Sequence, residues 1–221
     1  MSKAIIFDMD GTLFQTDRIL EQSLDETFRQ LRSLGQWEKD TPIEKYREIM
    51  GVPLPIVWET LLPQHSSEVR VQADSYFQER LVENIRSGNG DLYPNVKEVF
   101  SYLNENNWSI YIASNGLVDY LRAIVDFYHL GEWVTETFSI QQINSMNKSD
   151  LVRSVIDKYS ITSGAVVGDR LSDIKAAKDN GLVAVGCRFD FAREEELAQA
   201  DFVINDLMEL KDVLLEGHWG Q

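Results

Sequence analysis

The stretch that decides the fold lies near the amino terminus, where residues 4–16 read AIIFDMDGTLFQT. It begins with four apolar residues, and a short continuous apolar run is typical of a strand that is buried on both faces of a parallel sheet. Asp8 and Asp10 follow, and then Gly11, which permits a tight turn. Residues two apart on an extended backbone point to the same side. We therefore expect both carboxylates to project together from the end of a buried strand.

Strand-like and helix-like segments alternate along the second part of the chain. Apolar runs occur at residues 109–114, 164–169, 182–187 and 201–206, and helical patterns occur at residues 95–107, 117–129, 148–160 and 172–181. This alternation predicts an α/β domain with an open, Rossmann-like parallel sheet. Residues 17–86 contain helical patterns and no convincing strand pattern. We predict an α/β core of residues 1–16 and 87–221, with an all-helical cap domain of residues 17–86 inserted after the first strand.

Two helices of the predicted cap carry boundary patterns. Residues 17–35 place five apolar side chains on one helical face and end at a glycine; these residues are Leu20, Leu24, Phe28, Leu31 and Leu34, followed by Gly35. Thr41 is followed three residues later by Glu44, which is the spacing of a capping box. These patterns predict one helix that ends before Gly35 and a second that starts after Thr41.

Composition excludes several classes of protein. Hydrophobic residues make up 43% of the 221 residues, which is enough for a buried core. The longest apolar runs fall short of the roughly 18 residues that span a bilayer, and the first apolar run is too short for a signal peptide. The net charge of −15 argues against binding to a nucleic-acid backbone. We expect a soluble cytoplasmic protein that binds neither nucleic acid nor membrane.

Acidic and polar residues follow the predicted strands. Asp8 and Asp10 follow the first strand, Ser114 and Asn115 end the second, and Asp169 ends the third. Ligands of open α/β sheets bind at the carboxyl ends of the strands. Converging carboxylates repel one another, a divalent cation offsets this repulsion, and oxygen ligands without His or Cys favour Mg²⁺ over Zn²⁺. Of two adjacent acids, one can act as a nucleophile while the other transfers protons.

Four motifs in sequence order resemble those of the haloacid dehalogenase-like (HAD) phosphohydrolase superfamily. They are DMDGT at residues 8–12, Ser114 at a strand end, Lys148 at a helix start, and GDRLSD at residues 168–173. The resemblance covers the whole chain, with an α/β core at both ends and a helical insert after the first motif. It is closest to the branch that holds phosphoglycolate phosphatases and β-phosphoglucomutases with helical caps.

The resemblance implies a role for each matched residue. Asp8 would attack phosphorus and form an aspartyl-phosphate, and Asp10 would protonate the leaving oxygen and then activate water. Ser114 and the backbone amide of Asn115 would hold phosphoryl oxygens, and Lys148 would offset negative charge. Asp8, the backbone carbonyl of Asp10, and Asp169 would bind Mg²⁺, with Asp173 as a further ligand or an outer partner. The implied activity is Mg²⁺-dependent hydrolysis of a small phosphorylated metabolite.

Some of these residues have simpler interpretations. Ser114 has the position of an N-cap for the helix at residues 117–129. Lys148 lies in NKSD rather than the KP form that is common for this motif, and a lysine at a helix start is often a surface residue. Asp173 has the position of an acid that stabilises a helix N-terminus. Thr12 either contacts phosphate or only supports the turn.

The sequence leaves other functions open. A sugar-phosphate mutase of the same superfamily keeps both Asp8 and Asp10, although its fourth motif usually resembles ED. A non-catalytic phosphate-binding module on the same scaffold is a second alternative. A signalling receiver domain gathers similar residues, but the chain is about 100 residues too long for one and the cap has no place in it. Four cationic residues of the predicted cap domain either contact an anionic substrate or lie on solvated helix faces; they are Arg18, Lys45, Arg47 and Arg70.

Overall fold

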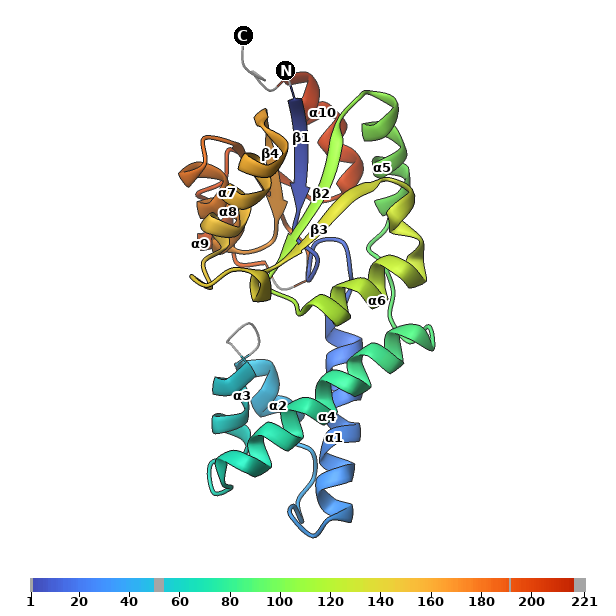
Figure 1. The fold of residues 1–221 in the computed structure, drawn as a ribbon, viewed down its shortest axis with the longest axis vertical. Helices are drawn as coiled ribbons and strands as arrows, with labels where there is room; N and C mark the ends of the chain where they lie inside the picture. Colours follow the sequence, from blue (N-terminus) through green and yellow to red (C-terminus); the bar gives the residue numbers. More distant parts are fainter. Residues whose placement is uncertain (1, 50–53, 191, 217–221) are drawn as a thin grey trace. The chain divides into compact units, whose positions relative to one another are not determined.

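A computed structural model of the chain describes residues 2–49, 54–190 and 192–216. The chain divides into two compact units. The first consists of Met1–Gln15 and Asp91–Gln221, and the second of Thr16–Gly90. We describe each unit by itself (Figure 1).

The first unit is built on a parallel sheet of six strands within the described residues, in the order β3-β2-β1-β4-β5-β6. The strands are β1 (Ser2–Phe7), β2 (Ser109–Ser114), β3 (Val134–Ser139), β4 (Ile161–Gly168), β5 (Val183–Cys187) and β6 (Phe202–Ile204). In β1, Phe7 pairs with Ile112 of β2 and with Val167 of β4, so these three strands end at nearly the same level. This architecture confirms the predicted α/β class with an open parallel sheet.

Helices pack on both faces of this sheet (Figure 1). They are α5 (Val96–Glu105), α6 (Val118–Tyr128), α7 (Lys148–Tyr159), α8 (Leu171–Asp179), α9 (Glu194–Leu197) and α10 (Leu210–Glu216), with short 3₁₀ turns η1 (Leu130–Glu132), η2 (Ile140–Gln142) and η3 (Leu207–Glu209). Ala4 and Ile6 of β1 join a buried cluster with residues of α7 and α8. The ring of Phe7 points to the other face and lies 5.2 Å from that of Phe100 in α5. Alternate residues of β1 are thus buried on opposite faces, which explains the continuous apolar run AIIF.

The predicted strand positions agree with the observed ones, except that β3 has no counterpart in the prediction. Four of the six residues in its sequence, VTETFS, are polar, and its first four residues are partly or fully exposed. β3 is an edge strand, and an edge strand needs fewer apolar side chains than a central one. The apolar runs that identified the other strands are therefore missing here.

The second unit contains α1 (Thr16–Ser33), α2 (Ile43–Glu48), α3 (Leu54–Leu61) and α4 (Ser67–Arg86). Its core is aromatic: the Trp58 ring lies 5.6 Å from that of Phe77, and the Phe28 ring lies 4.9 Å from that of Trp37. Leu34 was expected on the buried face of α1, but it is 57% exposed. That expectation was wrong because α1 ends at Ser33 and Gly35 has a φ of +69°, so Leu34 lies beyond the regular helix.

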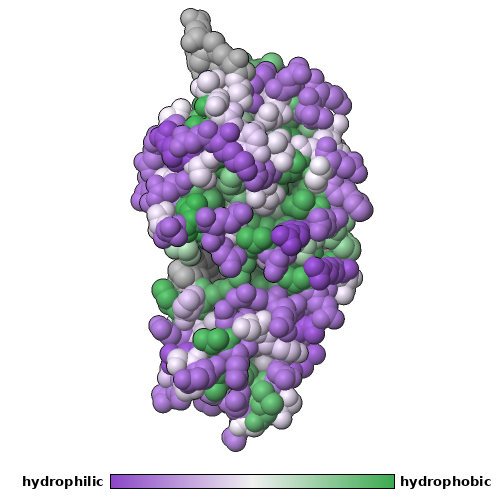
Figure 2. Space-filling view, viewed as in Figure 1, coloured by the Kyte–Doolittle hydropathy of each residue, from purple (hydrophilic) through white to green (hydrophobic). Residues whose placement is uncertain are grey.

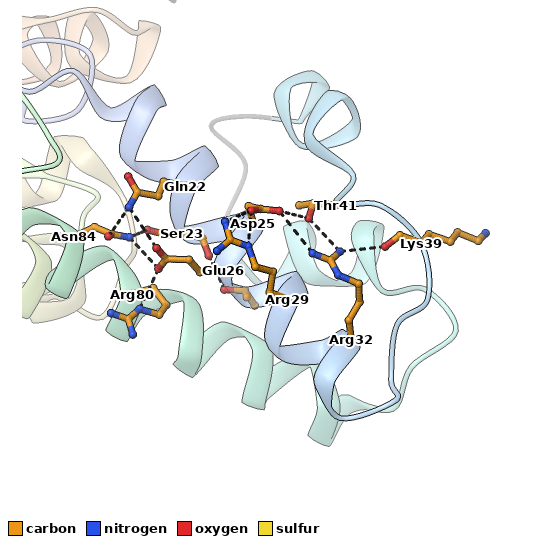
Figure 3. Close-up of polar contacts among 11 residues, drawn as sticks. Gln22, Ser23, Asp25, Glu26, Arg29, Arg32, Lys39, Thr41, Arg80 and Asn84 are labelled. Atoms are coloured by element: carbon orange, nitrogen blue, oxygen red, sulfur yellow. Dashed lines mark hydrogen bonds and ion pairs between the residues drawn. The ribbon is translucent and has the colours of Figure 1, made fainter.

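Polar side chains connect α1 to α4 and to the segment after α1 (Figure 3). Asn84 of α4 is buried; it donates to Ser23 at 3.1 Å and accepts from Gln22 at 2.8 Å. The Thr41 hydroxyl donates to Asp25 at 2.6 Å. The predicted capping box of Thr41 and Glu44 is wrong: α2 has Pro42 as its N-cap without a side-chain cap bond, because the Thr41 hydroxyl is used by α1.

The visible surface is largely hydrophilic (Figure 2). Hydrophilic residues, purple in Figure 2, cover much of the face in view. No helix in the described part of the chain combines the length and the apolar character needed to cross a membrane.

Candidate active site

A tight turn at the end of β1 carries the first motif. The backbone N–H of Asp8 donates to the carbonyl of Val167 at 2.9 Å, so Asp8 extends the β1–β4 ladder. The chain then turns, because the carbonyl of Met9 accepts from the N–H groups of Leu13 and Phe14, both at 2.9 Å. The regular strand ends at Phe7, so the strand alternation on which the expected common direction of Asp8 and Asp10 rested does not extend to Asp10.

Gly11 lets a second acid approach this turn. Its φ is +73°, which disfavours residues with a Cβ. A Cβ at this position would also lie 2.6 Å from Oδ2 of Asp169. The glycine therefore permits both the turn and the close packing of Asp169 against it.

Three buried carboxylates lie together at the ends of β1 and β4. One carboxylate oxygen from each of Asp8, Asp169 and Asp173 lies within 4.8 Å of the others. These residues are 7%, 3% and 1% exposed. Asp8 falls on the same side of β1 as Ala4 and Ile6, the side covered by α7 and α8. Asp173 is in the first turn of α8, where its Oδ2 accepts from the N–H of Arg170 at 3.1 Å.

Lys148 places a buried cation against this cluster. It is the first residue of α7, whose N-cap Asn147 accepts from the N–H of Ser149 at 2.8 Å. Its Nζ lies 2.6 Å from Oδ1 of Asp8 and 2.7 Å from Oδ1 of Asp173. Burial opposes the charged ammonium, but the two carboxylates outweigh it and raise the pKa of Lys148. The lysine is thus held as a cation and is not a surface residue.

One lysine does not neutralise three acids. Burial first, and then the charges of Asp8 and Asp173, raise the pKa of Asp169 from 3.8 to about 8. Burial is also the largest cause that raises the pKa of Asp173 to about 6, although Lys148 opposes it. Buried carboxylates that repel one another are stabilised in their ionised form when a further cation binds between them.

The donor set fits a divalent metal ion. Among the described residues, Oδ1 of Asp169 is buried without a hydrogen-bond partner. Such an atom is costly unless an ion, a water molecule or a ligand satisfies it. All the side-chain donors are carboxylate oxygens, which suit hard divalent cations. The cluster can therefore hold a divalent metal ion.

Ser114 is the last residue of β2, and Asn115 follows it. Ser114 is 1% exposed, and its Oγ accepts from the N–H of Gly116 at 3.0 Å. It does not cap α6, because the N-cap of that helix is Leu117, so the N-cap interpretation is wrong. Ser139 at the end of β3 donates its hydroxyl to the carbonyl of Gly116 at 2.6 Å and holds the loop in place. Asn115 is exposed at the carboxyl end of the sheet.

Asp10 and Thr12 occupy separate positions in the turn. The Asp10 carboxylate is not part of the three-acid cluster; its Oδ1 accepts from the hydroxyl of Tyr120 at 2.5 Å. Thr12 is fully buried, and its hydroxyl has no hydrogen-bond partner in the described part of the chain.

The structure brings Asp8, Lys148, Asp169 and Asp173 into direct proximity. Ser114 and Asn115 lie on the neighbouring strand β2 at the same edge of the sheet, because β2 is parallel to β1 and Phe7 pairs with Ile112. Tyr120 and Ser139 were not predicted. Tyr120 lies in a segment whose pattern indicates only a helix, and Ser139 ends a strand that the sequence did not predict, so the sequence holds no indication of what their hydroxyls contact.

Three of the four cationic residues considered in the helical unit have partners there. Arg47 donates to Glu21 at 2.5 and 2.9 Å, and Lys45 donates to Glu48 at 2.8 Å. Arg70 donates to the carbonyl of Leu62 at 3.0 Å at the end of α3. These contacts favour a structural role on solvated helix faces.

Comparisons with known proteins match the chain over nearly its full length. A phosphoglycolate phosphatase from Vibrio vulnificus (strain CMCP6) is 24% identical over 225 residues, which cover 96% of each chain. The pyrophosphatase PpaX from Listeria monocytogenes serotype 4b (strain CLIP80459) is 21% identical over 214 residues, or 93% of each chain. The crystal structure of a predicted phosphoglycolate phosphatase from Haemophilus somnus 129pt has the same fold, with a TM-score of 0.84 at 18% identity over 96% of this chain and 98% of that one.

A family model covers most of the chain. The model of haloacid dehalogenase-like hydrolases matches residues 2–181, which include every strand and helix that contributes to the acid cluster. The chain belongs to the haloacid dehalogenase-like hydrolase family.

Proposed function

We propose that this protein is a Mg²⁺-dependent phosphatase that hydrolyses a small phosphorylated metabolite through an aspartyl-phosphate on Asp8. The observation that carries the proposal is the buried group of three carboxylates and one lysine at the carboxyl edge of the sheet. Phosphoryl transfer requires in-line positioning of the reacting groups and compensation of negative charge. A fixed carboxylate beside a buried ammonium supports both requirements.

In the first step, a carboxylate oxygen of Asp8 attacks phosphorus, and the bond from phosphorus to the leaving oxygen breaks. Asp10 in its protonated form gives its proton to that oxygen, so the leaving group departs as an alcohol. The Asp8 side chain is held for attack by its 2.6 Å contact with Lys148. Ser114 and the backbone N–H of Asn115 hold phosphoryl oxygens at the end of β2.

In the second step, water attacks the phosphorus of the aspartyl-phosphate. Asp10, now ionised, accepts a proton from this water, and the bond from phosphorus to the Asp8 oxygen breaks. Inorganic phosphate leaves, Asp8 is regenerated as a carboxylate, and Asp10 is again protonated. The same residue thus acts first as an acid and then as a base, which suits its position outside the acid cluster.

Mg²⁺ would be held by the carboxylates of Asp8, Asp169 and Asp173 and by the backbone carbonyl of Asp10. When bound, it supplies positive charge that offsets the carboxylates and the phosphoryl oxygens. Lys148 supplies a further positive charge next to Asp8 and Asp173. Together they allow a phosphate dianion to approach a site rich in acids.

The substrate class is a small phosphorylated metabolite. Relatives with similar identity are named for phosphoglycolate and for pyrophosphate, so the names do not fix one substrate for this chain. We assign the substrate selectivity to the helical unit Thr16–Gly90. This unit would act as a cap that excludes water from the reaction. A cytoplasmic location is part of the same proposal. The alternative of a sugar-phosphate mutase is not favoured, because the relatives compared above are named as phosphatases.

The proposal is tested by phosphate release from a panel of phosphorylated metabolites, in Mg²⁺ and in EDTA. We expect release by the wild-type protein in Mg²⁺, none in EDTA, and none above background from Asp8→Asn, which keeps the size of the side chain but removes the nucleophile. Asp126→Asn on the exposed side of α6 is the matched control and should keep wild-type turnover. A folded, Mg²⁺-loaded wild-type protein that releases no phosphate from any panel member would reject the proposal.

A further inference from the structure

We infer that Tyr120 is a positioning residue that fixes the carboxylate of Asp10 for proton transfer to the leaving group. The inference rests on the proposed function, in which Asp10 moves this proton. It adds a residue from α6 that none of the four motifs contains.

The contact is direct and partly shielded from water. The hydroxyl of Tyr120 donates to Oδ1 of Asp10 at 2.5 Å, and Tyr120 is 8% exposed. Hydrogen bonds to carboxylates are short and strong compared with neutral ones. A carboxylate that is bound at one oxygen loses the freedom to rotate away.

The ring of Tyr120 is itself held by two contacts. Its centroid lies 6.5 Å from that of Phe14 in an edge-on arrangement, and Phe14 belongs to the same turn as Asp10. It also packs against Gly116, where a Cβ would lie 3.0 Å from Cδ1 of Tyr120 and 2.9 Å from Cδ2 of Leu121. Gly116 therefore leaves the space that the ring occupies.

These contacts connect two parts of the proposed site. Gly116 follows Ser114 and Asn115, and its N–H donates to Oγ of Ser114 at 3.0 Å. Tyr120 thus spans from the loop assigned to the phosphoryl oxygens to the turn that carries the proton donor. A buried tyrosine with two side-chain torsions holds its hydroxyl with little freedom, and catalytic groups need positions fixed within about 0.5 Å.

The test uses Tyr120→Phe, which removes only the hydroxyl. A leaving alkoxide needs a proton, whereas p-nitrophenolate leaves without one. We compare kcat/KM for the alkyl phosphate that is the best substrate of the panel and for p-nitrophenyl phosphate. The ratio kcat/KM reports the steps up to formation of the aspartyl-phosphate, so the later hydrolysis step does not enter.

A positioned general acid contributes about 10²–10⁴-fold, so its misplacement is expected to lower kcat/KM for the alkyl phosphate by about 10- to 100-fold. We expect a change of less than about threefold for p-nitrophenyl phosphate, whose departure gains little from the acid. Equal losses with both substrates would mean that the hydroxyl has only a structural role, and no loss with either would mean that it has none. Both results would overturn the inference.

Tyr128→Phe is the matched control. Tyr128 lies at the end of the same helix, its ring lies 6.0 Å from that of Phe14, and its buried hydroxyl has no hydrogen-bond partner among the described residues. The variant makes the same chemical change without touching Asp10, and it should leave both kcat/KM values at the wild-type level.

Crystal structures of wild-type protein and Tyr120→Phe give a second readout that does not depend on turnover. We expect a single side-chain conformation of Asp10 in the wild type. In the variant we expect either a rotated Asp10 carboxylate or two alternative conformers. An unchanged Asp10 would overturn the inference even if the wild type proved inactive. An inactive wild type with a rotated Asp10 in the variant would instead reject the proposed function and leave the positioning role standing.

Discussion

The acid cluster predicts an unusual dependence of stability on pH in the absence of metal. Burial, together with Asp8 and Asp173, raises the pKa of Asp169 from 3.8 to about 8 in the folded protein. Between these two values Asp169 is ionised in the unfolded chain but protonated in the folded protein. Folding then takes up a proton, so the contribution of Asp169 to the free energy of unfolding falls as the pH rises through this window. Below the window the side chain is protonated in both states and the penalty disappears.

The magnitude follows from the slope of about 1.36 kcal/mol per pH unit for one such group. Asp169→Asn keeps the size of the side chain and removes the titration. In EDTA, the free energy of unfolding of the variant relative to wild type should rise by about 3 kcal/mol from about pH 5 to about pH 7. Asp169 is 3% exposed, so solvent screens this effect only weakly.

Urea unfolding in EDTA across this pH range, followed by tryptophan fluorescence and circular dichroism, measures the difference. Asp126→Asn on an exposed helix face should give a difference that does not change with pH. Mg²⁺ should stabilise wild type and have little effect on Asp169→Asn, because the variant lacks a ligand. A difference between Asp169→Asn and wild type that stays constant with pH, or equal stabilisation of both proteins by Mg²⁺, would refute the reasoning.

Two further substitutions test the remaining parts of the structure. Lys148→Met should lower the free energy of unfolding in EDTA by about 3–5 kcal/mol, because Asp8 and Asp173 lose their buried cation. The control is Lys178→Met, which removes the cation of the half-exposed Lys178–Asp201 ion pair. A loss of stability no larger than in this control would contradict the assignment of Lys148 as a buried cation. Phe28→Ala should destabilise the helical unit by about 3–5 kcal/mol, because Phe28 is fully buried. Leu34→Ala, at a 57% exposed position, should change little, and urea unfolding that ranks these two variants the other way would show that the core has been misidentified.

Much of the fold could be predicted because central strands and amphipathic helices leave strong patterns. β1 and β2 carry continuous apolar runs since both of their faces are covered by helices. β3 carries no such apolar run, because an edge strand tolerates Thr and Glu, so its six residues resemble a loop in the sequence. The start of α2 was misread for a different reason: Thr41 contacts Asp25, and a contact across sixteen positions cannot be inferred from local spacing.

The site was predictable to the extent that it follows strand ends. Asp8, Ser114 and Asp169 come directly after buried strands, so topology alone brings them to one edge of the sheet. The buried pairing of Lys148 depends on how α7 packs, and the hydrogen bond from Tyr120 to Asp10 depends on the turn at Met9. Neither contact leaves a pattern in a single sequence, because each joins residues more than a hundred positions apart.

The sequence separation between β1 and its partners has a consequence for synthesis on the ribosome. β1 ends at Phe7, but its neighbours β2 and β4 begin only at Ser109 and Ile161. Thr16–Gly90 is a helical unit made by one continuous segment of the chain, and helical units fold faster than sheets of distant strands. This unit can therefore form on the nascent chain while the apolar AIIF segment still lacks its partners. During that interval β1 is a ready target for chaperones and for aggregation, and the acids of the site meet only after β4 has been made.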